Sequence, residues 1–129
     1  MSEKVRIAVV GGGRMGTPLI MDFLTRPFVS LVGVADVNPE SRGAQIAKTH
    51  GIFFCEDASV LAQKGEEIDM IIDVSGDPDV KKSLKQAFID SNNRSTIIVH
   101  DLTARLIMSL AADSSELVET YHPEDRGIG

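Results

Sequence analysis

Three glycines near the start of the chain have the types and spacing needed to bind a phosphate group. Gly11, Gly13 and Gly16 follow directly on an apolar run, residues 5–10, and precede an amphipathic stretch. Gly11 lets the chain leave a strand in a tight turn, and Gly13 has no side chain to keep a pyrophosphate from the backbone. The helix that follows would direct its N–H groups and the positive end of its dipole to the same place, and Gly16 would let it pack close to the strand. The pattern predicts a dinucleotide-binding turn.

An acidic residue stands where such a turn would need one. Asp36 closes the next apolar run, residues 31–35, and lies 20 residues after Gly16. A carboxylate at this distance can accept hydrogen bonds from an adenosine ribose, and its charge repels a 2′-phosphate. We therefore expect NAD to bind in preference to NADP. Two alternatives stay open: Asp36 could simply cap the turn that it begins, and Arg42, near the start of the next helix, could reach a 2′-phosphate.

Further candidate contacts follow from their neighbours in sequence. Arg14 could pair with a pyrophosphate oxygen or extend into solvent, and Met15 could pack over the adenine side or in the core. Ser75 and Gly76 form a loop of small residues that could face the cofactor or only cap the next helix. The predicted cofactor-binding set is Gly11, Gly13, Arg14, Met15, Gly16, Asp36, Ser75 and Gly76.

The rest of the sequence alternates short apolar runs with helical stretches. Strands are expected at 5–10, 31–35, 52–54, 69–74 and 96–100, and helices at 14–24, 39–50, 59–64, 78–91 and 102–119. Such an alternation gives a parallel sheet covered on both faces and wound by right-handed crossovers. We expect an α/β fold, a doubly wound Rossmann sheet of about five strands in the order 3-2-1-4-5. The dinucleotide-binding domain would take residues 1–120, and residues 121–129 would be a flexible tail.

The glycine turn, the segment Val32–Glu40 and the helix Arg42–His50 resemble the amino-terminal domain of the Gfo/Idh/MocA oxidoreductases. The resemblance covers about the first 80 residues, and homoserine dehydrogenase and dihydrodipicolinate reductase begin similarly. It implies that the chain binds NAD or NADP and that the loop of Ser75 and Gly76 lies along the nicotinamide half of the cofactor. In this family a second domain carries most of the sugar or polyol site.

The sequence departs from the family after the fifth strand, where the family carries a Glu-Lys-Pro motif. The segment Val99–Arg105 has no lysine. His100 and Asp101 could act as a base and its orienting acid, although Asp101 as a helix cap is the simpler interpretation. We therefore assign no catalytic residue, and no metal site, since His122 has no cluster of ligand-type residues near it in sequence. The lysines at 81, 82 and 85 are expected to form a solvated face.

Two functions are compatible with this pattern. The chain could be the cofactor-binding part of a larger or multi-chain oxidoreductase, not catalytically competent alone, or a non-catalytic module that senses NAD(H). The last predicted helix carries an apolar stripe that either packs on the sheet or meets a partner, which makes a homodimer, a partner chain or a downstream domain the expected neighbour. Its members are Leu102, Leu106, Ile107, Leu110, Leu117 and Val118.

Composition narrows the classes of partner and the compartment. The formal net charge of −6 and the absence of a basic face argue against nucleic acid. No apolar run approaches the roughly 20 residues that span a bilayer. The single cysteine, Cys55, cannot form an intrachain disulfide and is expected to be a buried strand-end thiol rather than a catalytic one. Together with a start, Met1–Lys4, that lacks a signal-peptide pattern, these features predict a cytoplasmic protein.

Overall fold

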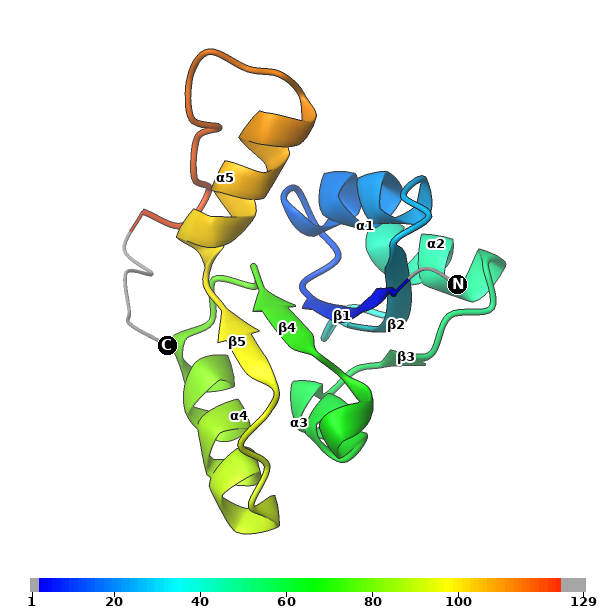
Figure 1. Cartoon of the computed structure of the whole chain (residues 1–129), viewed down its shortest axis with the longest axis vertical. Helices are drawn as coiled ribbons and strands as arrows, with labels where there is room; N and C mark the ends of the chain where they lie inside the picture. The colour runs from blue at the N-terminus through cyan, green and yellow to red at the C-terminus, as the bar shows by residue number, and fades with distance from the viewer. Residues whose placement is uncertain (1–2, 124–129) are drawn as a thin grey trace.

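The computed structural model describes residues 3–123, which form one five-stranded parallel sheet flanked by helices (Figure 1). The strand order is β3-β2-β1-β4-β5, which confirms the predicted Rossmann-type α/β fold. The strands are β1 (Val5–Val10), β2 (Val29–Ala35), β3 (Phe54–Cys55), β4 (Met70–Asp73) and β5 (Ile97–Val99). The helices are α1 (Gly16–Leu24), α2 (Arg42–Thr49), α3 (Ala58–Ala62), the 3-10 turn η1 (Gly65–Glu67), α4 (Pro78–Ser91) and α5 (Asp101–Ala111).

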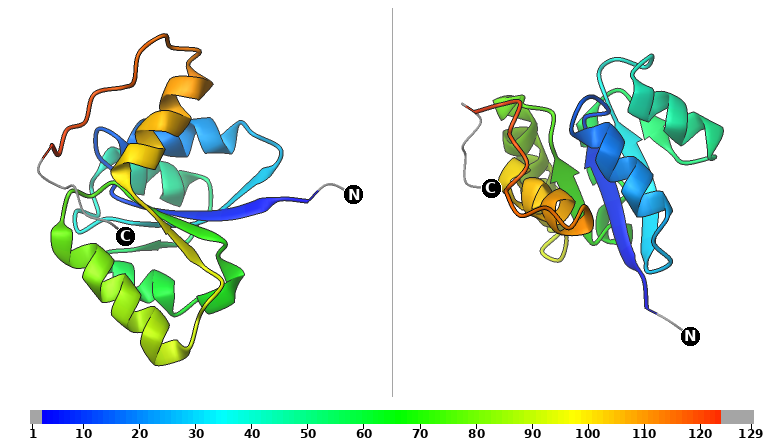
Figure 2. Two further views of the ribbon diagram at one scale, coloured as in Figure 1. Left: turned by 60° about the vertical axis from the view of Figure 1, so that its left-hand side comes forward. Right: turned by 90° about the horizontal axis from the view of Figure 1, so that it is seen from above.

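The sheet is buried on both faces, as an α/β sheet requires (Figure 2). Alternate residues of β1 point to opposite sides, so Ile7 and Val9 pack with α1, α2 and α5, whereas Ala8 and Val10 pack with α3 and α4. The strands therefore read as continuous apolar runs rather than as alternating ones. Their carboxyl ends meet at one edge, where the turns after β1, β2 and β4 come together.

Two side-chain caps begin the helices that border the candidate site: α4 starts at Pro78 as expected, whereas α2 starts at Arg42 rather than at residue 39. The Asp77 side chain accepts a hydrogen bond from Asp79 N–H, and Pro78 takes the first position of α4, where its missing N–H costs nothing. Ser41 Oγ accepts from Ala44 N–H at 3.2 Å and begins α2. Both caps lie at the carboxyl edge of the sheet, so they fix the helices that border the candidate site.

The last helix differs from the expectation at both ends. His100, not Asp101, is the N-cap, and its Nδ1 accepts from Leu102 N–H at 3.4 Å. The helix ends at Ala111 instead of residue 119, because Asp113 adopts a left-handed conformation, with φ 53°. Ser114 Oγ then accepts from Glu116 N–H, a local bond that competes with further helix.

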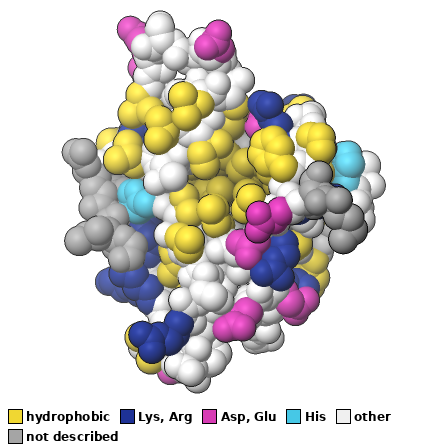
Figure 3. All heavy atoms as spheres, in the orientation of Figure 1, with side chains coloured by type: hydrophobic (Ala, Val, Ile, Leu, Met, Phe, Trp, Pro, Cys, Tyr) yellow, Lys and Arg dark blue, Asp and Glu magenta, His cyan; other side chains and the backbone are white. Residues whose placement is uncertain are grey.

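The apolar stripe of α5 does not pack on the sheet as one surface. Leu102, Leu106 and Leu110 are 58%, 50% and 72% exposed, while Ile107 packs against the core. The three exposed leucines repeat at intervals of four residues and so share one face of the helix. Figure 3 shows hydrophobic side chains gathered over α5 and in the hollow between α5 and α1. Of the two alternatives for this stripe, packing on the sheet therefore does not hold for these three leucines.

Candidate functional site

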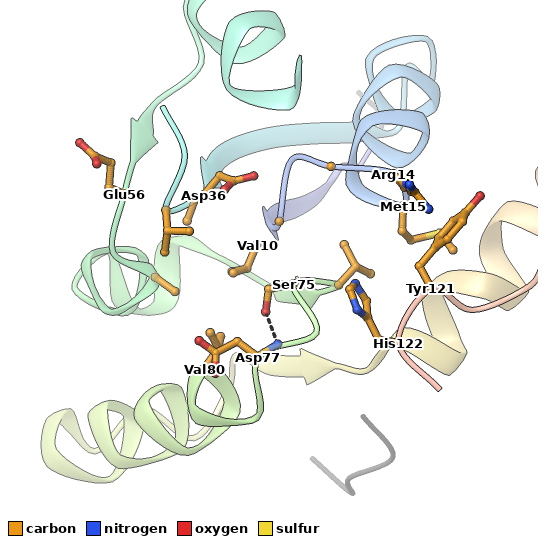
Figure 4. A pocket seen from close by; sticks show the side chains of 16 residues that line it. Val10, Arg14, Met15, Asp36, Glu56, Ser75, Asp77, Val80, Tyr121 and His122 are labelled. Atoms are coloured by element: carbon orange, nitrogen blue, oxygen red, sulfur yellow. Dashed lines mark hydrogen bonds between the residues drawn. The ribbon is translucent and has the colours of Figure 1, made fainter. Parts of the chain in front are cut away.

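A pocket of about 430 Å³ lies at the carboxyl edge of the sheet, within the size range of small-molecule sites (Figure 4). It forms where the turns after β1, β2, β3 and β4 meet the segment that follows α5. Its lining residues are Val10, Gly11, Gly13, Arg14, Met15, Ala35, Asp36, Val37, Glu56, Ala58, Val74, Ser75, Asp77, Val80, Tyr121 and His122. Six of the eight predicted contacts are among them; Gly16 and Gly76 are not.

The glycine turn is held by close backbone approach on one side and is open on the other. Gly11 has φ 105°, and a Cβ there would lie 3.0 Å from the Ser75 backbone. A Cβ on Gly16 would overlap the Gly11 carbonyl oxygen, so the start of α1 lies directly on the turn. A Cβ on Gly13, in contrast, would meet no atom within 4 Å. The bare backbone of Gly13 thus faces free space in the pocket, as contact with a pyrophosphate requires.

Asp36 follows β2 and joins that strand to the glycine turn. Its Oδ2 accepts from Gly12 N–H at 2.6 Å, and its Oδ1 accepts from Asn38 N–H at 2.9 Å. The bond to Asn38 caps the turn, which was one of the two alternatives for Asp36. The bond to Gly12 holds the carboxylate at the pocket wall. Each carboxylate oxygen has two lone pairs, so both can accept a further hydroxyl. Arg42 is exposed at the first position of α2 and does not line the pocket.

Gly12 and Gly43 were not predicted, although they bring α2 against the glycine turn. Gly43 N–H donates to the Gly12 carbonyl at 3.0 Å. A Cβ on Gly43 would lie 2.6 Å from Gly12 Cα, so neither position has room for a side chain. The signal that could have found this contact is the pair of small residues, Gly43 and Ala44, in the first turn of α2.

The loop after β4 is anchored to a buried carboxylate. Ser75 N–H and Oγ–H both donate to Asp73 Oδ1, at 3.0 and 2.7 Å, and Asp77 N–H donates to Ser75 Oγ. Asp73 is fully buried, and Lys81 Nζ lies 3.4 Å from its Oδ2. The expected solvated lysine face is therefore wrong at Lys81, because the first turn of α4 lets the long side chain reach a carboxylate that needs a positive partner. Lys82 and Lys85 are exposed as expected.

Neither Arg14 nor Met15 matches only one of its two expected roles. Met15 is 4% exposed and belongs to the core cluster, yet it also lines the pocket. The Arg14 guanidinium lies 5.4 Å from the centre of the Tyr121 ring, a cation–π distance. Tyr121 and His122 were expected in a flexible tail, but these two residues line the pocket; residues 124–129 of that tail lie outside the described part of the chain.

His100 and Asp101 do not line this pocket. Asp101 is buried, and its Oδ2 accepts from Thr120 Oγ–H at 2.9 Å. Within residues 3–123, no group of three or more His, Cys, Asp or Glu side chains could hold a metal ion, and no helix is long and apolar enough to cross a membrane. Cys55 is half-buried, and burial raises the pKa of its thiol, with the charge of Asp57 adding to the effect.

Comparison with known proteins finds one family and several partial relatives. The pattern of the Gfo/Idh/MocA oxidoreductases, described as an oxidoreductase family with an NAD-binding Rossmann fold, matches residues 5–100. An acetaldehyde dehydrogenase of Thermus thermophilus is 30% identical over 76 residues, which are 58% of this chain and 25% of that protein. Another, from Metapseudomonas furukawaii, is 35% identical over 52 residues, 40% of this chain and 17% of that protein.

Solved structures share the fold. A scyllo-inositol dehydrogenase from Lactobacillus casei matches with a TM-score of 0.59 and 20% identity, over 89% of this chain and 35% of that one. The same enzyme has been solved with bound NAD(H) and scyllo-inositol. A myo-inositol dehydrogenase from Corynebacterium glutamicum matches with a TM-score of 0.57 and 21% identity, over 85% of this chain and 33% of that one. The chain thus spans about a quarter of the first curated relatives and about a third of these structures.

Proposed function

This chain belongs to the Gfo/Idh/MocA oxidoreductase family, and we propose that it is the cofactor-binding part of a larger or multi-chain oxidoreductase, binding NAD in preference to NADP. The observation that supports this most is the junction of Asp36 with the glycine turn. Asp36 Oδ2 lies 2.6 Å from the Gly12 nitrogen, and the next residue, Gly13, has its backbone uncovered. A ribose acceptor and a phosphate cradle are therefore adjacent, in the order that the adenosine half of a dinucleotide needs.

The proposed roles follow the pocket wall. Asp36 accepts the hydroxyls of the adenosine ribose, and the side chains of Val37 and Ala58 lie nearby for the adenine. The turn of Gly11, Gly13 and Gly16 takes the pyrophosphate, with Arg14 close enough to neutralise it. Met15 and Ser75 border the remaining half, and Gly76 lies behind the His122 ring there. Bound NAD would supply a hydride acceptor, and the chain would supply binding and orientation.

The second candidate is a non-catalytic module that senses NAD(H). It is favoured by the position of His100 and Asp101 outside the pocket, since neither can reach a reacting group there. On either proposal the chain alone should not reduce NAD with sugars, polyols or hydroxy acids. Saturable reduction that is lost in His100→Ala would contradict this. The cytoplasmic location and the boundary of the domain at residue 120 stay predictions.

We also propose self-association or a partner on the outer face of α5. Leu102, Leu106 and Leu110 are all at least half exposed and share one face of α5. Contiguous apolar surface of this kind usually marks an interface, and a two-fold dimer is the commonest arrangement.

Calorimetric titration with NADH and NADPH tests the cofactor proposal. NADH should bind more tightly, because the Asp36 charge repels the 2′-phosphate. Asp36→Asn keeps a hydrogen-bond acceptor and removes the charge, so the preference should fall about tenfold. Asp90→Asn, on the exposed side of α4, is the matched control and should leave the preference unchanged. Equal or tighter binding of NADPH by the unmodified chain would overturn the NAD preference.

A further inference from the structure

The segment that follows α5 returns along the helix to the pocket, and we call residues 114–122 the C-terminal strap (Figure 1). Val118 anchors its middle: its N–H donates to Ser109 Oγ at 2.9 Å, and its carbonyl accepts from Arg105 Nε at 2.7 Å. The Val118 side chain also packs against the core. The strap is therefore held by both backbone groups of one residue, which fixes its path toward the carboxyl edge of the sheet.

The end of the strap is fixed at the pocket by a buried carboxylate. Thr120 Oγ–H donates to Asp101 Oδ2 at 2.9 Å, and Asp101 is only 4% exposed. His122 N–H in turn donates to Thr120 Oγ at 3.0 Å. These two bonds set the directions of the side chains on either side of the bend: the Tyr121 ring lies against the Arg14 guanidinium, and the His122 ring lies against Gly76.

These rings lie on one side of the pocket only. Figure 4 shows Tyr121 and His122 opposite Asp36 and Glu56, with Ser75 between. A dinucleotide crosses the switch in strand order, from the β1–β2 side to the β4 side. If Asp36 takes the adenosine ribose and Gly13 the pyrophosphate, the second nucleotide must lie over the loop of Ser75 and Gly76. The His122 ring already fills the space that a side chain at Gly76 would need.

We infer that the C-terminal strap occupies the nicotinamide half of the pocket, so that the chain with its strap in place is a receptor for adenosine diphosphate ligands such as ADP-ribose. A complete dinucleotide binds by displacing His122 and Tyr121. The inference rests on the proposed function, because it takes Asp36 as the contact of the adenosine ribose. The consequence is that the chain should favour ADP-ribose over NAD. NAD can bind only if the strap contacts are broken, whereas ADP-ribose can bind while they stay in place. The apparent affinity for NAD is then the intrinsic affinity multiplied by the fraction of molecules whose strap is open.

Calorimetric titration of both ligands into the full chain and into His122→Ala tests this selectivity. Removing the ring should tighten NAD by about tenfold and change ADP-ribose by less than about twofold. Thr120→Val, which removes the bond to Asp101, should act in the same direction and serves if His122→Ala does not fold. His50→Ala is the matched control, since His50 lies at the end of α2, bonded to Ile46, and not in the pocket.

Tyr121 gives a second, independent measurement, because the chain has one tyrosine and no tryptophan. NAD should raise the acrylamide quenching of its fluorescence in the unmodified chain, and ADP-ribose, whose adenine absorbs equally, should not. Unchanged or weaker NAD binding in both variants would overturn the strap inference and leave the proposed function standing. Binding of NAD without binding of ADP-ribose would also overturn the strap inference alone, whereas binding of neither ligand would overturn both.

Discussion

The two sides of the pocket are built from different kinds of contact. On the Asp36 side, glycine backbones meet with no side chain between them, and the carboxylate is bonded to the Gly12 N–H. On the other side, the Tyr121 ring lies against Arg14 and the His122 ring lies against Gly76. Both rings belong to the C-terminal strap. The first side can change only if the fold changes. On the strap inference, the second opens when the Tyr121 and His122 side chains move away, so the chain would combine a fixed half with a movable one.

The largest effect on stability is expected when a side chain is added to a glycine in the fixed half. Gly16→Ala should destabilise the protein by about 3 kcal/mol, because its Cβ would overlap the Gly11 carbonyl and force the turn away from α1. Gly13→Ala is the matched control, and its stability should stay within about 0.5 kcal/mol, since that Cβ enters free space. Urea denaturation measures both. Equal midpoints for the two variants would mean that the turn is not close-packed.

A substitution on the exposed side of α5 tests whether this helix binds a partner. Leu106→Glu places a charge in the middle of the leucine face, which is already in solvent, so the monomer should lose less than about 1 kcal/mol of stability. Self-association should weaken by about tenfold or more. Light scattering over a range of micromolar concentrations measures it, with Lys82→Glu on the opposite side of the sheet as control. An unmodified chain that stays monomeric throughout would contradict the proposed contact.

The smallest effect is expected at the opposite edge of the sheet, away from both halves of the pocket. The Arg6 guanidinium bonds Asp69 and lowers the pKa of that carboxyl to about 2. A lowered pKa gives stability that is present above the ordinary value of 3.8 and is lost as the pH falls toward 2. Asp69→Asn should therefore be less stable than the unmodified chain at pH 6, and the difference should shrink as the pH falls below 3.8 and vanish only below pH 2. Both residues are largely exposed, so the gap should be small. A constant gap from pH 6 to pH 2 would show that the ion pair does not control it.

The same division explains how far the sequence predicts the structure. The glycine turn, Asp36 after β2 and the cap at Asp77 and Pro78 were predictable because each signal lies within a few residues of the structure that it produces. The strand order followed from the alternation of apolar runs and helices. The glycine turn and Asp36 make up the fixed half of the pocket.

The movable half was not predictable, because its contacts join residues far apart in sequence. Leu117 and Val118 continue the spacing of α5, yet Asp113 ends the helix and Val118 returns to bond with Ser109. Lys81 looked like one of three surface lysines, and only the fold reveals the buried carboxylate of Asp73 beside it. Nothing near Tyr121 in the sequence indicates that it meets Arg14 of the glycine turn, more than a hundred residues away, and nothing near His122 indicates its contact with Gly76.

The central claim is that the pyrophosphate of a dinucleotide lies against Gly13, and titration of NADH into Gly13→Val tests it most directly. A Cβ at Gly13 meets no atom within 4 Å, so the valine side chain starts in free space over the turn and we expect the circular dichroism spectrum to stay native. We predict that NADH binding falls by at least about a hundredfold relative to the unmodified chain. A Gly13→Val protein with a native spectrum and unchanged affinity for NADH would contradict the account, because the pyrophosphate would then lie elsewhere.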